Sequence, residues 1–219
     1  MEGFINTVSN HISSKGESMP KVLIATLYSP DPVLLASNRV GADRLVLILN
    51  RQSDKRQDES LKLIKDSIGR VVDIKTVKIS AYDIPQIVKK CVEIIDLQPK
   101  EDRIFTNITS GRKTMALGLL FASYARSSRI ERIAYNPEED RSSVVYLPKM
   151  SFKLNDSQKK ILEFLEEGDT KGKSYSEMAE EIGMSRAMFY RTLDELKDLD
   201  MIDTEPELRL TDAGKIARL

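Results

Sequence analysis

The sequence predicts an α/β protein with a mainly parallel sheet, followed by a smaller and mostly helical domain. Runs with strand character alternate with amphipathic runs of helical spacing up to about residue 148, as in a parallel sheet covered by helices. Two of the strand runs, KVLIATLY and DRLVLILN, are continuously apolar, which is typical of strands buried on both faces. After residue 154 this alternation stops, and short helical patterns separated by brief turns follow.

Each element of the first domain is predicted by its own pattern. Strands are expected at 21–28, 43–50, 71–79, 103–109 and 129–137, with an edge strand within 142–149. Helices are expected at 29–41, 54–69, 82–97 and 111–128. Asp31, with Pro32 after it, and Asp83 are the expected N-caps, and Gly69 is expected to end the second helix. Residues 19–148 are therefore expected to form a Rossmann-like sheet with helices on both faces.

The second domain is expected over residues 155–219. Helices are predicted at 155–168, capped by Asn155, at 174–183, opened by Ser174 or Ser176, and from Ser185 onward. The turn between the last two is brief and contains Gly183, which is typical of a helix-turn-helix. A two-stranded wing at 203–214 and a closing helix at 211–219 complete a winged helix-turn-helix. Residues 149–154 are expected to be a linker, and residues 1–18 a flexible N-terminal extension.

Composition excludes several classes of protein. The chain has 219 residues, 34 Lys and Arg, 34 Asp and Glu, and no net charge, so there is no global signal for nucleic acid or membrane. A single cysteine, Cys91, excludes an internal disulfide framework and a cysteine zinc site; on an apolar helical face it is expected to be core. No apolar run reaches the ~18 residues of a membrane span and no signal peptide is visible, so we expect a cytoplasmic protein without membrane contact, metal or cofactor.

The charges are distributed unevenly between the two domains. Residues 1–154 contain 24 Lys and Arg against 18 Asp and Glu, whereas residues 155–219 contain 10 against 16. The first part is therefore at +6 and the second at −6. This asymmetry supports a division into two domains.

The stretch NITSGRKTM, residues 107–115, combines hydroxyls, a glycine and two cations between a strand and a helix. Ligands of open α/β sheets bind beyond the carboxyl ends of the strands, and the amides of residues 110–113 are expected to open the helix toward an anion. The pattern is neither a Walker A loop nor a dinucleotide fingerprint. It favours phosphate or nucleotide binding, and the alternative is an ordinary capped helix with solvated cations.

Two segments, ATLYSPDPVLLASNRVGADRLVLIL and NITSGRKTMALGLLFASY, resemble the diagnostic segments of CRISPR-associated Rossmann-fold (CARF) domains. With the C-terminal domain, the resemblance covers about residues 19–219 and extends to the transcription-regulator branch common in archaea. It implies a homodimer that binds a cyclic oligoadenylate across its two-fold axis. The loop after the first strand matches the family by its position only. The family often has a Gly next to an aromatic residue there, whereas this chain has Tyr28 and Ser29. The implied ligand-binding positions are Tyr28, Ser29, Asn107, Thr109, Ser110, Gly111, Arg112 and Lys113.

The helix that begins near Ser185 is the expected recognition helix for double-stranded DNA, with a promoter palindrome as the target. Met188, Phe189 and Leu193 are expected to face the core. The charge of −6 opposes phosphate contact, so docking or dimerisation is the alternative role of this domain. The expected DNA-binding residues are Lys171, Lys173, Ser185, Arg186, Tyr190 and Arg191.

Three functions are compatible with these patterns. The first is a ligand-responsive CRISPR-associated transcription regulator, in which the ligand is bound and not cleaved. The second is a ring nuclease that cleaves cyclic oligoadenylate with Thr109, Ser110 and Lys113, while the winged helix only supports dimerisation. The third is an interaction module that binds neither ligand nor DNA. We expect no catalytic residues, because the single histidine, His11, lies in the extension and no paired carboxylates stand out.

Overall fold

The computed structural model describes residues 19–140, 143–148, 150, 154–168, 170, 172–205 and 207–219. The expected extension at residues 1–18, most of the expected linker and Lys171 lie outside these residues. The first part, called the α/β part below, contains β1 (Lys21–Thr26), α1 (Pro30–Val40), β2 (Arg44–Asn50), α2 (Lys55–Ile68), β3 (Asp73–Ile79), α3 (Ile84–Asp96), β4 (Arg103–Asn107), α4 (Lys113–Ala125), β5 (Ile130–Tyr135) and β6 (Val145–Leu147).

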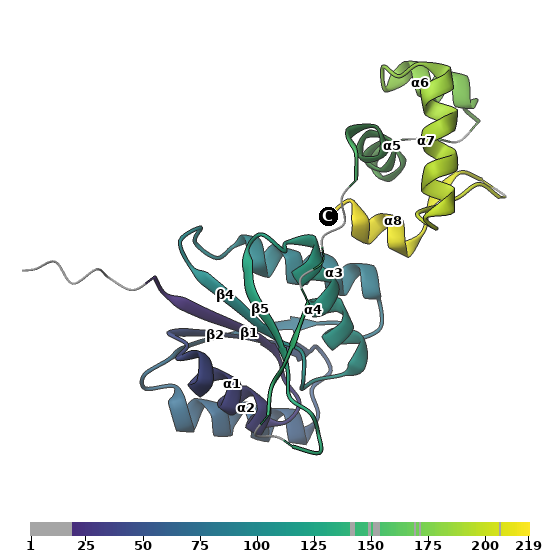
Figure 1. Ribbon diagram of the computed structural model, residues 1–219. Coiled ribbons are helices and arrows are strands. Elements are labelled where there is room, and N and C mark those ends of the chain that lie inside the picture. The colour runs from purple at the N-terminus through teal and green to yellow at the C-terminus, as the bar shows by residue number, and fades with distance from the viewer. Residues whose placement is uncertain are drawn as a thin grey trace, which may run out of the picture.

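The sheet confirms the predicted Rossmann-like topology. Its strand order is β3-β2-β1-β4-β5-β6, with five parallel strands and an antiparallel edge strand, β6. Helices α1 and α2 cover one face, and α3 and α4 cover the other (Figure 1). Strands β1 and β4 are neighbours although β2 and β3 lie between them in sequence. The order of the strands therefore reverses at the β1–β4 pair, where open α/β sheets bind their ligands.

Alternate side chains of β1 enter different cores. Val22 and Ile24 pack with α3 and α4, whereas Leu23 and Ala25 pack with α1 and α2, and all four are at most 1% exposed. This is why the strand is apolar at every position rather than at every second one. Strand β3 lies at the edge and keeps an alternating, more exposed pattern, as expected.

The starts of two helices differ from the sequence prediction. Helix α1 begins at Pro30 with Ser29 as its N-cap, so Asp31 lies in the first turn and does not cap it. Helix α4 begins at Lys113 with Arg112 as its N-cap, so residues 110 and 111 precede the helix instead of opening it. The other expected caps are confirmed: the Asp83 carboxylate accepts a hydrogen bond from the Gln86 amide, and Gly69 ends α2.

The carboxy-terminal part contains the predicted elements in the predicted order. They are α5 (Asp156–Glu167), α6 (Tyr175–Glu181), α7 (Arg186–Asp198), β7 (Ile202–Asp203), β8 (Arg209–Leu210) and α8 (Asp212–Ala217). Phe189 and Leu193 are buried between the helices, as expected. Met188 was expected in the core but is 47% exposed, and its sulfur lies 4.0 Å from the hydroxyl of Ser157 in α5. Gly183 takes a left-handed φ of 65° in the turn between α6 and α7.

Helix α8 connects the two parts. Ile216 is buried in the same apolar cluster as Ile87 of α3 and Leu119 of α4. Arg126, at the end of α4, donates hydrogen bonds to the Asp96 carboxylate and to the carbonyl of Leu219. The carboxyl end of α4 thereby contacts the last residue of the carboxy-terminal part.

Candidate functional site

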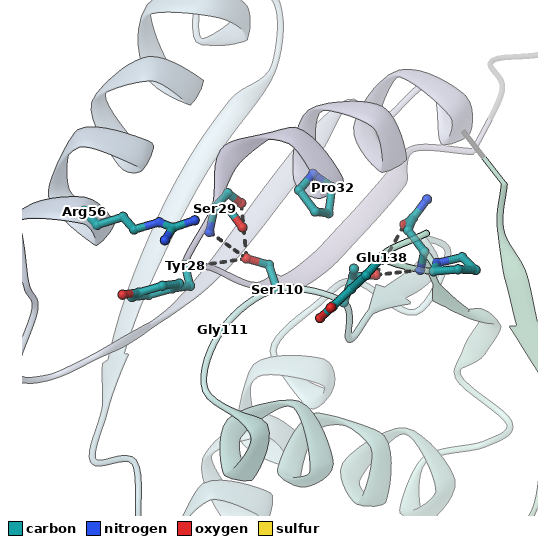
Figure 2. A pocket seen from close by; sticks show the side chains of 10 residues that line it. Tyr28, Ser29, Pro32, Arg56, Ser110, Gly111 and Glu138 are labelled. Atoms are coloured by element: carbon teal, nitrogen blue, oxygen red, sulfur yellow. Dashed lines mark hydrogen bonds between the residues drawn. The ribbon is translucent and has the colours of Figure 1, made fainter. Parts of the chain in front are cut away.

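A cavity of about 440 Å³ opens at the carboxyl ends of β1 and β4. Its walls come from the loops after β1, β4 and β5 and from the first turns of α1 and α2, and Figure 2 shows these side chains. The cavity volume lies in the range of small-molecule sites. The lining residues are Tyr28, Ser29, Pro32, Arg56, Thr109, Ser110, Gly111, Asn136, Pro137 and Glu138.

Ser110 fixes the loop after β4 against the loop after β1. Its hydroxyl accepts hydrogen bonds from the amides of Tyr28 and Ser29, both at 2.8 Å, and donates one to the Ser29 carbonyl at 3.1 Å. A hydroxyl has one donor and two acceptor sites, so these contacts saturate it. Ser110 is 4% exposed and positions the two loops rather than offering a free group to a ligand.

Gly111 is required by the backbone at this point. Its φ is 92°, a value that side-chain-bearing residues rarely adopt. A Cβ at this position would lie 2.7 Å from Cβ of Thr26, whose hydroxyl donates to the Ser110 carbonyl. The loop therefore passes directly over the end of β1, and Gly111, two residues before α4, lines the cavity.

Asn107 connects the loop after β4 to the loop after β5. It is fully buried, its amide donates to Asn136 Oδ1 at 3.0 Å, and its carbonyl oxygen accepts from the Thr109 amide at 3.0 Å. The Thr109 hydroxyl in turn accepts from the Asn136 amide at 2.8 Å and lines the cavity. Of the two, only Thr109 faces the cavity, and Asn107 orients the loops around it.

The amino terminus of α4 differs from most helix starts of this chain. Among the eight helices of the described residues, six have an N-cap side chain that accepts a backbone hydrogen bond, and α1 and α4 do not. In α1, Pro30 and Pro32 lack the N–H that would face an anion. Helix α4 keeps its first N–H groups and the positive end of its dipole, so it is the better anion-binding terminus.

The structure brings together part of the predicted site. Tyr28, Ser29, Thr109, Ser110 and Gly111 line the cavity, whereas Arg112 and Lys113 are exposed and do not line it. Sequence reasoning missed five lining residues. The pair at 136–137 directly follows β5, so the rule that ligands bind at the carboxyl ends of strands could have found it. Nothing in the local sequence places the missed residues of α1 and α2. The missed residues are Pro32, Arg56, Asn136, Pro137 and Glu138.

The predicted DNA-binding residues that the structure describes lie at the surface of the carboxy-terminal part. Arg186 and Arg191 are exposed, and Tyr190 is 48% exposed. Arg191 Nε lies 3.1 Å from Glu195 Oε1, and Lys173 Nζ lies 2.6 Å from Glu181 Oε2. Two of these cations are therefore paired with carboxylates of the same part. Ser185 caps α7 by accepting a hydrogen bond from the Met188 amide.

Cys91 is fully buried in α3, and burial raises the pKa of its thiol to about 12. Such a thiol is not a nucleophile near neutral pH. Among the described residues no group of three or more His, Cys, Asp and Glu side chains could hold a metal ion. In the same part of the chain, no helix is long and apolar enough to cross a membrane.

The fold and the cavity define a Rossmann-like protein with a ligand site at the reversal point of its sheet. Residues 33–148, more than half of the chain, match the model of the Csa3 CRISPR-associated Rossmann-like domain. The chain therefore belongs to this CRISPR-associated family, which confirms the CARF prediction for the α/β part. No curated protein matches the chain in sequence.

Several solved structures are similar to the chain. Can2 from Sulfobacillus thermosulfidooxidans, in complex with cyclic tetra-adenylate, shares 13% identity over 90% of this chain and 62% of its own, with a TM-score of 0.45. Csm6 from Enterococcus italicus, bound to cyclic hexa-2'-fluoro-hexa-dAMP, shares 20% identity over 82% of this chain and 53% of its own, with a TM-score of 0.47. Protein VC1899 from Vibrio cholerae shares 11% identity over 90% of this chain and 64% of its own, with a TM-score of 0.49. The chain thus spans less than two thirds of each.

Proposed function

We propose that the protein is a ligand-responsive CRISPR-associated transcription regulator. In this proposal the α/β part binds a cyclic oligoadenylate, and the carboxy-terminal part is a winged helix-turn-helix that binds promoter DNA. The observation that carries the ligand half is the cavity at the β1–β4 pair, whose lining residue Gly111 lies two residues before the uncapped start of α4. The resemblance to CARF domains and the family match of residues 33–148 supply the ligand class.

The residues around the cavity take distinct roles. The N–H groups at the start of α4 bind a phosphate, and the exposed side chains of Arg112 and Lys113 add positive charge at this helix start. Tyr28, Ser29 and Thr109 contact the ligand, while Ser110, Gly111 and Asn107 shape the loops. The uncapped start of α4 supports this division, because a bound phosphate would supply the missing N-cap acceptor.

A homodimer completes the site. A cavity of about 440 Å³ has the size of a site for one small molecule, whereas a ring of several nucleotides is larger and internally symmetric. Two copies related by a two-fold axis would present two equivalent cavities to such a ring. We therefore expect one ring per dimer.

The carboxy-terminal part supports the DNA half. The short turn through Gly183 joins α6 to α7, and β7 and β8 form a small antiparallel pair behind them, as in a winged helix. Arg186 and Tyr190 are exposed on the first turns of α7, where recognition helices contact base edges. A dimer would present two such helices to a palindromic promoter.

The test measures ligand and DNA on the same preparation. Cyclic oligoadenylates of three to six nucleotides are titrated by calorimetry, and light scattering gives the oligomeric state. Chromatography of the ligand after incubation separates a binder, which returns an intact ring, from a ring nuclease, which yields a linear product. Gel shifts with promoter fragments, with and without the ring, test the regulator. Absence of binding to every ring would refute the ligand half.

A further inference from the structure

Two charged side chains line the cavity, and they lie at opposite ends of it. Arg56 belongs to the first turn of α2, and Glu138 follows β5. Figure 2 shows Arg56 beside Tyr28 at one end and Glu138 at the other, with Ser110 between them. The other eight lining residues are uncharged. One end of the cavity therefore carries a positive charge and the other a negative charge.

We propose that Arg56 and Glu138 orient one nucleotide of the ligand in each cavity. Its phosphate lies on the side of Arg56, and a ribose hydroxyl or base amino group lies against the Glu138 carboxylate. This inference rests on the proposed function, because it states how a nucleotide lies in the same cavity. It makes these two residues specificity-determining, although neither belongs to the loops that the sequence singled out.

Arg56 is placed for a phosphate by its contact with Tyr28. Its guanidinium carbon lies 4.9 Å from the centroid of the Tyr28 ring. The backbone of Tyr28 is fixed, because its amide donates to Ser110 Oγ and its carbonyl accepts from Ser60 Oγ, at 2.8 and 2.9 Å. A cation–π contact at an exposed site orients the guanidinium weakly and uses none of its N–H donors. Guanidinium groups with free donors match two phosphate oxygens at once.

Glu138 is held by a rigid loop and is open to the cavity. The side chain of Asn136, 2% exposed, donates to the Ser143 carbonyl at 3.0 Å and accepts from Asn107 at 3.0 Å. Pro137 then fixes the backbone φ before Glu138. Within the described residues the structure gives the Glu138 carboxylate no partner. An ionised carboxylate only accepts hydrogen bonds, so it attracts O–H and N–H groups and repels phosphate.

The two residues therefore make opposite demands on a ligand. A nucleotide satisfies both, because it has a phosphate at one end and hydrogen-bond donors at the other. A ligand made of phosphate alone satisfies Arg56 but is repelled by Glu138. The cavity is consequently suited to a nucleotide and discriminates against inorganic polyphosphate.

The test titrates two probes, cyclic tetra-adenylate and inorganic tripolyphosphate, into the full-length protein by calorimetry at constant ionic strength. Arg56→Gln should weaken both probes, by roughly 10- to 100-fold for a lost charge-assisted contact. Glu138→Gln should weaken cyclic tetra-adenylate several-fold and strengthen tripolyphosphate, because it removes the repulsion. A sign that reverses between the two probes is not expected of a variant that merely perturbs the fold.

Two neighbouring variants serve as charge-matched controls. Lys55→Gln and Glu139→Gln change the net charge equally next to Arg56 and Glu138, but neither residue lines the cavity. Both should stay within about twofold of the wild type for either probe. Equal effects in controls and test variants would overturn the inference, since the general field would then suffice. A Glu138→Gln variant that weakens both probes would also overturn it.

The outcome for the wild type separates the inference from the proposed function. Binding of cyclic tetra-adenylate by the wild type, with unchanged affinity in Arg56→Gln and Glu138→Gln, overturns the inference and leaves the ligand half of the proposed function standing. If the wild type binds no cyclic oligoadenylate of any ring size, the proposed ligand and the inference fall together.

Discussion

The Ser110 hydroxyl accepts the backbone N–H of Tyr28 at 2.8 Å across 82 residues of sequence. This bond, with two further bonds to Ser29, joins the loops that follow the neighbouring strands β1 and β4. The loops are therefore one unit whose geometry depends on a single buried side chain. The ligand cavity inherits its shape from that unit.

Ser110→Ala should destabilise the protein and weaken ligand binding together. It leaves the partly buried amides of Tyr28 and Ser29 without their acceptor, and each lost hydrogen bond costs about 0.5–1.5 kcal/mol. Chemical denaturation measures the first effect, and titration with cyclic tetra-adenylate the second. Ser67→Ala, which removes an exposed hydroxyl bonded only within α2, is the control and should change neither value appreciably.

Gly111→Ala should disturb the site more than an alanine at another glycine of left-handed φ. Gly172 has a φ of 73° and open space around it, so Gly172→Ala measures the backbone strain alone. At Gly111 the new Cβ would also meet Thr26 at 2.7 Å, and overpacking adds about 1–3 kcal/mol. Denaturation midpoints of the two variants give the comparison. Equal midpoints would show that the loop moves away from Thr26 without a cost beyond the backbone strain that both variants share.

The sequence predicts the sheet well because buried parallel strands are apolar at every position. Leu23 and Ile24 face different cores, so both faces of β1 are buried. It predicts the loop at 107–113 because hydroxyls, glycine and cations coincide there. It does not predict Arg56 as a lining residue, because that contact depends on how α2 packs beside the loop after β1. Nor does it separate Ser110, which is saturated, from Thr109, which faces the cavity.

Lys113→Ala and Arg112→Ala should each weaken binding of cyclic oligoadenylate. Both residues are exposed at the start of α4, where their charge adds to that of the helix dipole. A charge-assisted hydrogen bond contributes about 1.5–3 kcal/mol, so calorimetric affinities should fall by roughly tenfold or more. Lys100→Ala, an exposed cation in the turn before β4 and away from the cavity, is the control. Unchanged affinity in both test variants would move the phosphate site elsewhere.

Arg126→Ala should loosen α8 from the α/β part. Arg126 donates to both carboxylate oxygens of Asp96 and to the carbonyl of Leu219, and Ile216 packs beside this contact. Hydrogen exchange of the α8 amides should therefore accelerate, while β1 stays protected. Arg103→Ala removes a comparable surface ion pair with Glu131 and is the control. If α8 exchanges equally in both variants, apolar packing alone fixes this helix.

The DNA prediction follows from the exposed face of α7 and the acidic surroundings. Arg186 lies in the first turn of this helix, where side chains contact base edges, so Arg186→Ala should relax sequence preference at one base position by about 1–3 kcal/mol. The charge of −6 over residues 155–219 should keep non-specific affinity weak. Gel shifts on the protein's own promoter and on a shuffled sequence measure both effects.

Lys173→Ala should instead weaken binding to all DNA sequences alike, because it removes a positive charge that is paired with Glu181. Lys173 Nζ lies 2.6 Å from Glu181 Oε2, so its removal leaves the Glu181 carboxylate uncompensated on the surface that would approach the phosphates. Lys197→Ala, in the last turn of α7, removes the same charge far from the amino-terminal turns of that helix and should have a smaller effect. Because both losses are electrostatic, they should shrink as salt rises. If no promoter fragment is retained at low salt, with or without cyclic oligoadenylate, the DNA half of the proposal is wrong and the carboxy-terminal part is a docking or dimerisation module.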